Sequence, residues 1–378
     1  MSKNERMLKA KDTKFDEYFT EYRAISTEIP HYREHLKGKI IYCNCDDPVY
    51  SNFWRYFHNN FSSLGIKKLI STHYVKDSEP SYKIEYTGGD DFNMDAGKVT
   101  QIVGDGEYTA GDFRSKDCIK LLKEADIVIT NPPFSLFNEY IKQLLEYNKK
   151  FIIIGKMSAI NNNDLFPLLK DNKIWTGYKS FGGGMDMIVP KEYFDESKVK
   201  KYIVNAEGQF IVNIEGVIWY TNIDTSIRHD GLWHKNGELD KTQAHRYYEG
   251  NEDNYPKYYN FDGIDVDSIA NIPIDYEGYI GVPITIMEKF NPEEIELIGT
   301  GSSVEKKYIH TVTEKKKTIS YVDKNGNIVW STPYSISERK LGNGLRIMGI
   351  DGKPANSPFS RLIIRIINPI KKDDDLGY

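Results

Sequence analysis

The chain has 378 residues, of which 39% are hydrophobic and 28% are charged, so it can bury a sizeable core in one large or two ordinary domains. No apolar run approaches the length of a membrane span, and the charged N-terminus lacks a signal-like apolar core, which together predict a cytoplasmic protein. The net charge of −5 argues weakly against nucleic-acid binding, although residues 300–378 contain 14 Lys/Arg against 8 Asp/Glu.

Helical patterns alternate with short apolar runs through the first half of the chain. Amphipathic patterns predict helices at 16–36, with a break at Pro30, and at 51–64, 119–124 and 136–147. β-rich runs predict strands at 39–43, 68–72, 126–130 and 151–155. This alternation predicts an α/β fold with a doubly wound, parallel, Rossmann-like sheet. Ligands bind beyond the carboxyl ends of the strands in such sheets, which points to the turns after Cys43, Thr72 and Thr130.

The pattern changes beyond about Gly182, where strand-like pieces stand among polar, aromatic stretches. Apolar runs at 217–220 and 361–366 predict strands, and residues 315–330 predict a hairpin centred on a Lys-Asn-Gly-Asn turn. We therefore predict one domain over residues 1–225 and a mixed α+β region over residues 226–378.

The tetrapeptide Asn131-Pro132-Pro133-Phe134 directly follows an apolar strand, where an open α/β sheet places its active site. An exocyclic amine on adenine is a poor nucleophile, because its lone pair is delocalised into the ring. The Asn131 side-chain oxygen and the Pro132 carbonyl, held by two successive prolines, could accept its two hydrogens and accommodate the developing positive charge. Phe134 offers a flat face on which an extruded base could stack.

Simpler explanations compete with a catalytic role, because a strand followed by Asn-Pro-Pro is also a good structural turn. The glycine run at 182–184 lacks the lysine and Ser/Thr of a phosphate loop. Neither the three cysteines nor the scattered histidines form a ligand set, so no metal is expected.

Longer strings of residues carry a resemblance along nearly the whole chain. They are Asp16–Thr20, Tyr42–Pro48 with Ser51–Phe53, Asn131–Phe137, Pro283–Thr285 and Lys289–Pro292. With these strings the chain resembles the EcoRI-type adenine-specific DNA methyltransferases. The resemblance is weakest at about residues 305–334.

The resemblance implies transfer of a methyl group from S-adenosylmethionine to N6 of an adenine that is flipped out of duplex DNA. It further implies a catalytic domain over residues 1–225, a target-recognition region over residues 226–378, and a monomer. Such an enzyme belongs to a restriction-modification system, with an endonuclease that shares its site without a stable complex, or stands alone in a mobile element.

Cofactor contacts are implied at three places along the chain. The residues are Tyr18, Phe19, Thr20, Cys43, Asn44, Cys45, Asp46, Asp47, Asp112 and Phe113. Within this set the resemblance implies that Asp112 bonds the cofactor's adenine amine. Two departures from methyltransferases at large stand out: the first strand ends without a glycine-rich turn, and no acid for the ribose follows Thr72.

Basic residues in the last fifth of the chain are candidate DNA contacts, namely Lys306, Arg339, Lys340, Arg346 and Arg361. Two alternatives to a DNA methyltransferase stay open. The first is a methyltransferase that acts on RNA adenine or a protein glutamine, since related tetrapeptides serve those substrates. The second is a non-catalytic DNA-binding protein that keeps the fold.

Overall fold

The structure is a computed structural model that describes residues 18–75, 80–91, 93–199, 201–235, 238–239, 245, 247–248, 255–258, 261–301, 319–322, 328–332, 346–348, 354–356 and 361–370. The chain divides into two compact units. The first runs to Ala159 and resumes at Ile174–Thr225, and the second combines Ile160–Lys173 with the residues from Ser226 onward. Within the described ranges no helix has both the length and the apolar character to cross a membrane.

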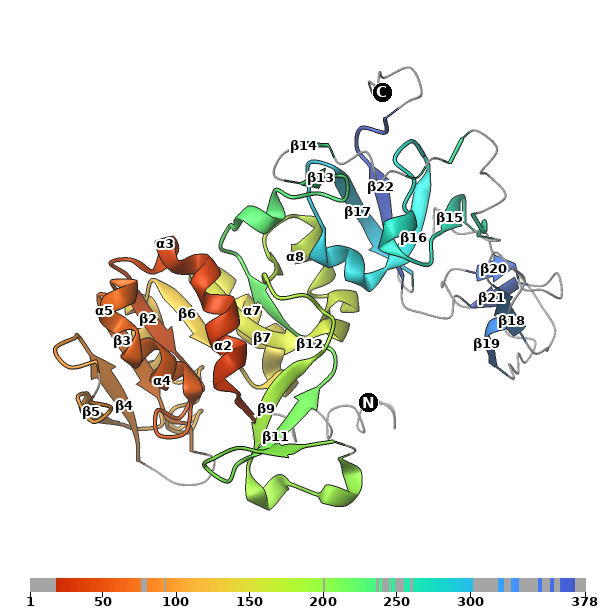
Figure 1. Ribbon diagram of the computed structural model, residues 1–378. Coiled ribbons are helices and arrows are strands. Elements are labelled where there is room, and N and C mark those ends of the chain that lie inside the picture. The colour runs from red at the N-terminus through yellow and green to blue at the C-terminus, as the bar shows by residue number, and fades with distance from the viewer. Residues whose placement is uncertain are drawn as a thin grey trace. The chain divides into compact units, whose positions relative to one another are not determined.

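An eight-stranded sheet forms the centre of the first unit, with the order β5-β4-β3-β2-β6-β7-β12-β8 (Figure 1). Its central strands are β3 (Lys68–Thr72), β2 (Ile40–Cys43), β6 (Ile127–Thr130) and β7 (Lys150–Lys156), and all three pairings among them are parallel. The outer strands are antiparallel, namely β4 (Ser81–Tyr86), β5 (Lys98–Ile102), β12 (Val217–Thr221) and β8 (Trp175–Thr176). The expected parallel sheet is therefore confirmed at its centre and wrong at both edges.

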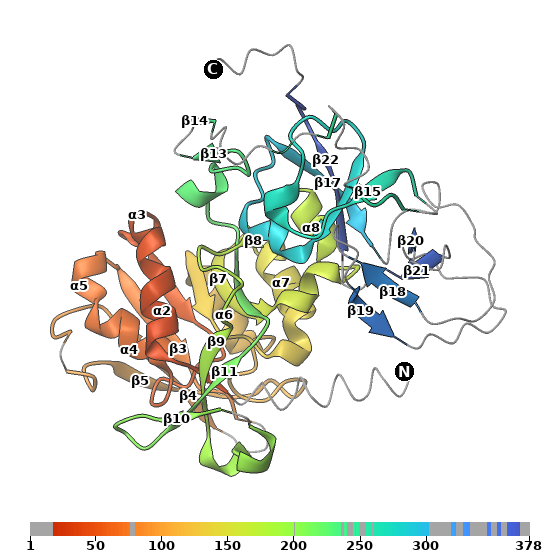
Figure 2. The same ribbon diagram turned by 45° about the vertical axis from the view of Figure 1, so that its right-hand side comes forward.

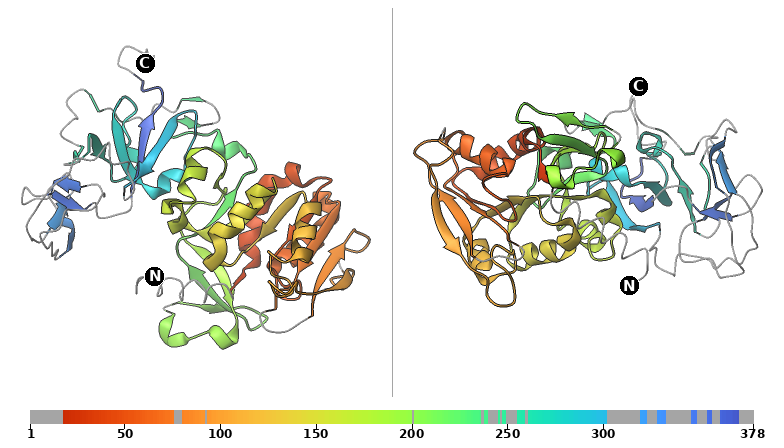
Figure 3. Two further views of the ribbon diagram at one scale, coloured as in Figure 1. Left: turned by 180° about the vertical axis from the view of Figure 1, so that it is seen from behind. Right: turned by 90° about the horizontal axis from the view of Figure 1, so that it is seen from below.

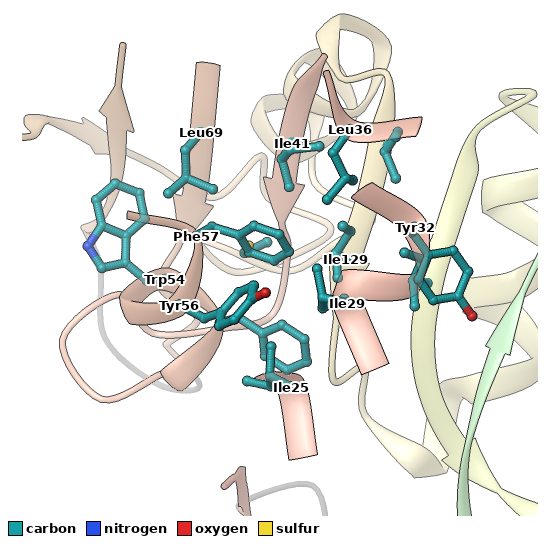
Figure 4. Packing of buried hydrophobic residues seen from close by; sticks show 14 of the residues in the cluster. Ile25, Ile29, Tyr32, Leu36, Ile41, Trp54, Tyr56, Phe57, Leu69 and Ile129 are labelled. Carbon is teal, nitrogen blue, oxygen red and sulfur yellow. The ribbon is translucent and has the colours of Figure 1, made fainter. Parts of the chain in front are cut away.

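Helices cover both faces of this sheet. Alternate strand residues such as Ile41, Ile129 and Ile154 lie in one apolar cluster with α2 (Tyr22–Glu28) and α4 (Asn52–Asn59). Figure 4 shows Trp54 and Phe57 of α4 in this cluster beside Leu69. The opposite face is covered by α6 (Lys116–Glu124) and α7 (Phe137–Glu146), which appear yellow in the view from behind (Figure 3).

The expected helix over residues 16–36, with its break at Pro30, is confirmed from Tyr22 onward and wrong at Phe19–Thr20. Phe19–Thr20 form strand β1, followed by α2, a 3-10 helix at Ile29–Tyr32 with Pro30 in its first turn, and α3 (Arg33–Leu36). β1 is extended because it pairs with β9 (Met185–Val189), far away in the sequence. The expected helix at 51–64 is divided into α4 and α5 (Phe61–Leu64), with Ser51 as the N-cap of α4.

A second, four-stranded sheet of the first unit has the order β1-β9-β11-β10 (Figure 2). β11 (Phe210–Ile214) pairs antiparallel with both β9 and β10 (Ile203–Val204). β9, β10 and β11 lie in the connection between β8 and β12, so this connection supplies the partner for β1.

The second unit contains a four-stranded sheet with the order β15-β16-β22-β17. Its strands are β15 (Gly263–Asp265), β16 (Tyr279–Pro283), β22 (Arg361–Ile366) and β17 (Ile295–Thr300), and α8 (Phe166–Lys170) contacts β17. The predicted hairpin is confirmed by the pairing of β18 (Ile319–Val322) with β19 (Ile328–Thr332). Two further strand pairs are β13 (His234–Lys235) with β14 (Glu238–Leu239) and β20 (Arg346–Met348) with β21 (Pro354–Asn356).

Short 3-10 helices complete the described part of both units. They are η2 (Phe134–Leu136), η3 (Met157–Asn161), η4 (Lys191–Tyr193), η5 (Glu196–Lys198), η6 (Ser226–Arg228), η9 (Ile269–Asn271) and η10 (Ile284–Glu288).

Candidate active site

The order of the central strands creates a switch point between β2 and β6. The chain proceeds from β2 to β3 on one side and from β6 to β7 on the other, while β2 and β6 are parallel neighbours. A crevice forms beyond the carboxyl ends of two such strands. The turn that follows Cys43 and the turn that begins at Asn131 both stand at this edge, which is the place that the sequence predicts for the site.

Asn131 is fixed by two hydrogen bonds that leave one of its atoms unpaired. Its side-chain Nδ2 donates to the carbonyl oxygen of Tyr18 at 3.0 Å, and its backbone N–H donates to Asp46 Oδ2 at 3.3 Å. Because a carbonyl can only accept, the amide nitrogen must face Tyr18. The Asn131 Oδ1 atom is buried and has no hydrogen-bond partner among the described residues.

Phe134 and the two prolines complete the tetrapeptide that the sequence predicts to be catalytic. Pro132 and Phe134 are buried, and Pro133 has φ −61° and ψ 122°, an extended conformation that ends the turn at the start of η2. The Lys156 ammonium, at the end of β7, lies 5.6 Å from the centre of the Phe134 ring. The sheet therefore places an aromatic ring and a cation at the turn that carries the unpaired Asn131 oxygen.

Asp46 joins the turn after β2 to the turn after β6. It is buried, and its carboxylate accepts from the Thr130 hydroxyl, from Ser51 Oγ at 3.1 Å and from the Asn131 backbone. Burial raises the pKa of Asp46 to about 7, against the hydrogen bonds, which lower it.

Cys45 adopts the backbone conformation that glycine adopts in many nucleotide-binding turns. Its φ is +65°, in the left-handed region, which few residues other than glycine enter without strain. The neighbouring Asn44 is buried, and its backbone carbonyl accepts from the Thr130 hydroxyl. The chain therefore makes a tight turn after its first parallel strand without the glycine that the sequence lacks there.

Asp47 extends from the same turn to the end of β3. Its Oδ2 lies 3.0 Å from His73 Nδ1, and its Oδ1 accepts from the Tyr82 hydroxyl at 3.1 Å. Burial raises the pKa of Asp47, but hydrogen bonds with His73, the Val49 backbone and Tyr82 outweigh it and hold the pKa below its ordinary value. Asp47 thus brings a carboxylate to the end of β3, where the sequence shows no acid.

A cavity of about 490 Å³ adjoins this turn within the first unit. Phe19 and Asp47, both predicted cofactor residues, line it together with Tyr50, Tyr193 and Phe210. Its volume lies in the range of small-molecule sites, and its lining combines several aromatic rings with the Asp47 carboxylate and Lys191.

Asp112 and Phe113 lie at the same edge of the sheet. A Cβ atom on Gly111, which has φ +81°, would stand 1.9 Å from the His73 carbonyl oxygen, so this loop contacts the end of β3 directly. The Asp112 carboxylate pairs with the Arg114 guanidinium at 2.8 Å, and the Phe113 ring lies edge-on to Tyr140. The predicted cofactor residues from all three places along the chain are therefore connected by contacts.

The structure changes the set of candidate DNA contacts. Arg361 is only 3% exposed, and its guanidinium forms a bidentate ion pair with the Asp265 carboxylate at 2.9 and 3.1 Å. Its predicted phosphate contact is therefore wrong, because the side chain is buried in the second unit's sheet. Lys306, Arg339 and Lys340 lie outside the described residues, as does the side chain of Arg346.

Three polar residues of the site were missed in the sequence analysis. Thr130 bonds Asp46 and Asn44, Ser51 bonds Asp46, and His73 pairs with Asp47. Thr130 carried a recognisable signal, because it is the only polar side chain in an otherwise apolar four-residue strand.

Comparison with known proteins identifies the family. A model of the family described as "Adenine-specific methyltransferase EcoRI" matches residues 6–336. The chain belongs to this family of adenine-specific methyltransferases. The predicted resemblance and the predicted enzyme class are thereby confirmed.

Curated relatives support the same assignment over most of their length. The chain is 42% identical over 315 residues to the type II methyltransferase M.EcoRI of Escherichia coli, covering 80% of this chain and 91% of the relative. Two Mycoplasma type II methyltransferases are also similar: M.MgeORF184P of M. genitalium at 36% and M.MpnI of M. pneumoniae at 34%, each covering 77% of this chain and 84% of the relative. No solved structure shows significant similarity to the chain.

Proposed function

We propose that this adenine-specific methyltransferase transfers a methyl group from S-adenosylmethionine to N6 of an adenine flipped out of duplex DNA. The observation that carries the proposal is the buried Oδ1 of Asn131 at the switch point of the sheet, which has no hydrogen-bond partner in the part of the chain that the structure describes. A buried acceptor without a partner is costly, so such an atom in a native site indicates a ligand donor. An exocyclic amino group supplies that donor.

Asn131 and Pro132 would act through hydrogen bonds and orientation alone. The bond from Asn131 Nδ2 to the Tyr18 carbonyl holds the side-chain oxygen in place before the substrate arrives. With the Pro132 carbonyl as second acceptor, the two oxygens would each accept a hydrogen bond from N6 of the adenine. These bonds would orient the amine and stabilise the positive charge that develops on its nitrogen. Phe134 would stack on the flipped base and keep its amine in line with the methyl donor.

The residues at the edge of β2 and β3 fit S-adenosylmethionine. The Asp47 carboxylate at the end of β3 can accept from ribose hydroxyls, in place of the acid that is missing after Thr72. The Asp112 carboxylate can accept from the adenine amine, and the aromatic rings of the cavity beside Phe19 suit a planar or aliphatic portion of the cofactor. When bound, S-adenosylmethionine supplies an activated methyl group on a sulfonium.

The partners and the biological context of the enzyme are proposed from its resemblance to the EcoRI-type methyltransferases. The enzyme acts as a cytoplasmic monomer on double-stranded DNA, in a restriction-modification system with an endonuclease that reads the same site, or as an orphan modification enzyme. Residues 1–225 bind the cofactor and perform catalysis, and residues 226–378 recognise the target. Lys306, Arg339, Lys340 and Arg346 stay proposed as DNA contacts.

The test combines methyl transfer with cofactor binding. Purified protein is incubated with labelled S-adenosylmethionine and unmethylated genomic DNA, and the modified bases are mapped. We expect N6-methyladenine at one recurrent short sequence. We expect Asn131→Ala to abolish transfer while calorimetry shows unchanged cofactor binding, and Asp47→Ala to weaken cofactor binding instead. Methylation of RNA or of a protein glutamine, with no methylation of DNA, would overturn the assignment of the substrate. Failure of the protein to bind S-adenosylmethionine would overturn the proposed activity.

A further inference from the structure

The Asp46 carboxyl group bonds both the turn that carries Asn131 and the N-cap of the helix after the cofactor turn. From the catalytic side, Asp46 Oδ2 accepts from the Thr130 hydroxyl and from the Asn131 backbone N–H. From the other side, Asp46 Oδ1 accepts from Ser51 Oγ, and Ser51 in turn caps α4 by accepting from the Phe53 backbone N–H at 3.1 Å.

The backbone of Asp46 is fixed as firmly as its side chain. Ser71 Oγ, on β3, donates to the Asp46 carbonyl at 2.7 Å and lies 3.2 Å from the Cys43 carbonyl, so β3 holds the turn from a third direction. All of Asp46, Ser71 and Thr130 are buried. The carboxyl group therefore occupies a position that three elements define independently of any ligand.

This arrangement differs from that of a cofactor ligand. The resemblance implies Asp46 as a cofactor contact, yet its side chain is buried, its hydrogen bonds run to the Asn131 turn and to Ser51, and it does not line the cavity. The neighbouring Asp47 is the residue of the pair that lines the cavity. Position and hydrogen bonds thus separate the two adjacent acids into different roles.

We infer that Asp46 is a positioning residue of the methyl-transfer step, which sets the placement of Asn131 through the Thr130 hydroxyl and the Asn131 backbone N–H. The inference rests on the proposed function, because it concerns the geometry of the amine acceptor. A displacement of about 1 Å in a catalytic group can lower a rate on the order of 100-fold. Loss of Asp46 should therefore lower the rate of methyl transfer and leave cofactor affinity unchanged.

The experiment separates the rate of the chemical step from binding. Single-turnover methylation of a DNA duplex that contains the mapped site is measured at saturating S-adenosylmethionine, and cofactor affinity is measured by calorimetry, for Asp46→Ala and Asp46→Asn. We expect Asp46→Ala to lower the single-turnover rate on the order of 100-fold with unchanged affinity. Asp46→Asn keeps an oxygen that can accept from Thr130 and Asn131, and should recover most of that loss.

A second pair of variants tests the hydrogen bond itself. Thr130→Val removes the hydroxyl and keeps the shape, whereas Thr130→Ser keeps the hydroxyl and serves as the matched control. We expect Thr130→Val to slow the chemical step more than Thr130→Ser does. The loss of rate in Asp46→Ala combined with Thr130→Val should be smaller than the product of the two single losses, because both substitutions remove the hydrogen bond between Asp46 and Thr130. Thermal unfolding of each variant reports whether it has folded, and the Thr130 pair carries the test if Asp46→Ala has not.

Two results would overturn the inference. One is an Asp46→Ala enzyme with weakened cofactor binding and a normal single-turnover rate, which would make Asp46 a cofactor ligand. The other is full additivity of the Asp46 and Thr130 substitutions, which would show that they act separately. Failure of the proposed function is distinguishable from both, because then the wild-type enzyme itself would not methylate the duplex.

Discussion

Cys45 combines a left-handed backbone with a partly buried side chain in the turn after β2. For a residue with a Cβ atom this conformation costs about 1–2 kcal/mol. The cost is tolerated because the flanking residues are fixed. Asn44 accepts a hydrogen bond from Thr130, and the Asp46 carboxylate accepts three hydrogen bonds. Local strain of this kind is typical of turns that present backbone atoms to a ligand.

The effect of a Cys45 substitution on stability should depend on how well the new residue adopts the left-handed backbone conformation, and not on loss of the thiol. We expect Cys45→Gly to be as stable as the wild type or slightly more so, since relief of strain offsets the added freedom of the unfolded chain. Cys45→Val should lose about 1–3 kcal/mol, because a β-branched residue fits the left-handed region poorly. Urea unfolding gives the free energies, with Cys45→Ala as the control for loss of the thiol; a Cys45→Val protein as stable as Cys45→Ala would contradict this explanation.

Asp46 should make stability depend on pH. Its pKa in the folded protein is about 7, above its ordinary value of 3.8, so the folded state binds the proton more tightly than the unfolded state. The resulting stabilisation is fully present below pH 3.8 and is lost as pH rises through about 7. Asp46→Asn cannot ionise, so its free energy of unfolding should rise relative to that of the wild type as the pH increases from 5 to 8. The increase should be on the order of 1.4 kcal/mol for each unit by which the pKa of Asp46 is raised within this range. Urea unfolding at both pH values measures the difference, and a constant difference would contradict the raised pKa.

At the scale of elements, the sequence analysis was most accurate where strands are buried on both faces. Continuous apolar runs such as Phe151–Ile154 indicate central parallel strands, and the structure has them. The outer strands β4 and β5 have sequences rich in Lys, Glu, Gln and Thr, so apolar periodicity gives little signal for them. β1 was missed because two residues carry no periodicity and the partner strand β9 lies far along the chain.

The site could be predicted as far as strand ends determine it. The switch-point rule placed Asn131 and the Asn44–Asp47 turn at one edge without knowledge of side-chain directions. The roles of Thr130 and Ser51 could not be predicted, because they depend on which side chains turn toward Asp46 after folding. Arg361 was misassigned for the opposite reason: a basic side chain in a basic segment gives no sign that it is paired and buried.

The ion pair between Arg361 and Asp265 connects β22 to β15 in the second unit. Removal of one partner leaves a buried charge, so we expect Arg361→Ala to destabilise the protein by about 3–5 kcal/mol. Arg365→Ala is the matched control on the same strand, because Arg365 and Glu296 are 48% and 40% exposed and their pair should contribute about 0–1 kcal/mol. Urea unfolding compares the two variants, and equal losses would show that burial does not govern the effect.

At the scale of the whole molecule, charge is distributed unevenly along the chain. Residues 1–299 contain 36 Lys/Arg and 47 Asp/Glu, whereas residues 300–378 contain 14 and 8. The basic excess over residues 300–378 suits an enzyme that approaches DNA with this part of its sequence.

DNA affinity should therefore fall with salt, through the basic C-terminal residues. We expect the logarithm of the association constant to decrease linearly with the logarithm of salt concentration. Replacement of Lys306, Arg339 and Lys340 by alanine should reduce the slope by about one for each phosphate group that is no longer neutralised. Fluorescence anisotropy with labelled duplex at several salt concentrations measures the slope; Arg365→Ala is the control, and an unchanged slope in the triple variant would remove these residues as phosphate contacts.

The pairing of β1 with β9 places a short N-terminal segment beside the proposed catalytic turn, since the Tyr18 carbonyl accepts from the Asn131 amide. A protein that starts after Thr20 would keep all eight strands of the large sheet and lose this carbonyl. The segment could be returned as a separate peptide that adds to the free edge of β9 as a strand. Methyl transfer by an enzyme that lacks this segment would then depend on the added peptide.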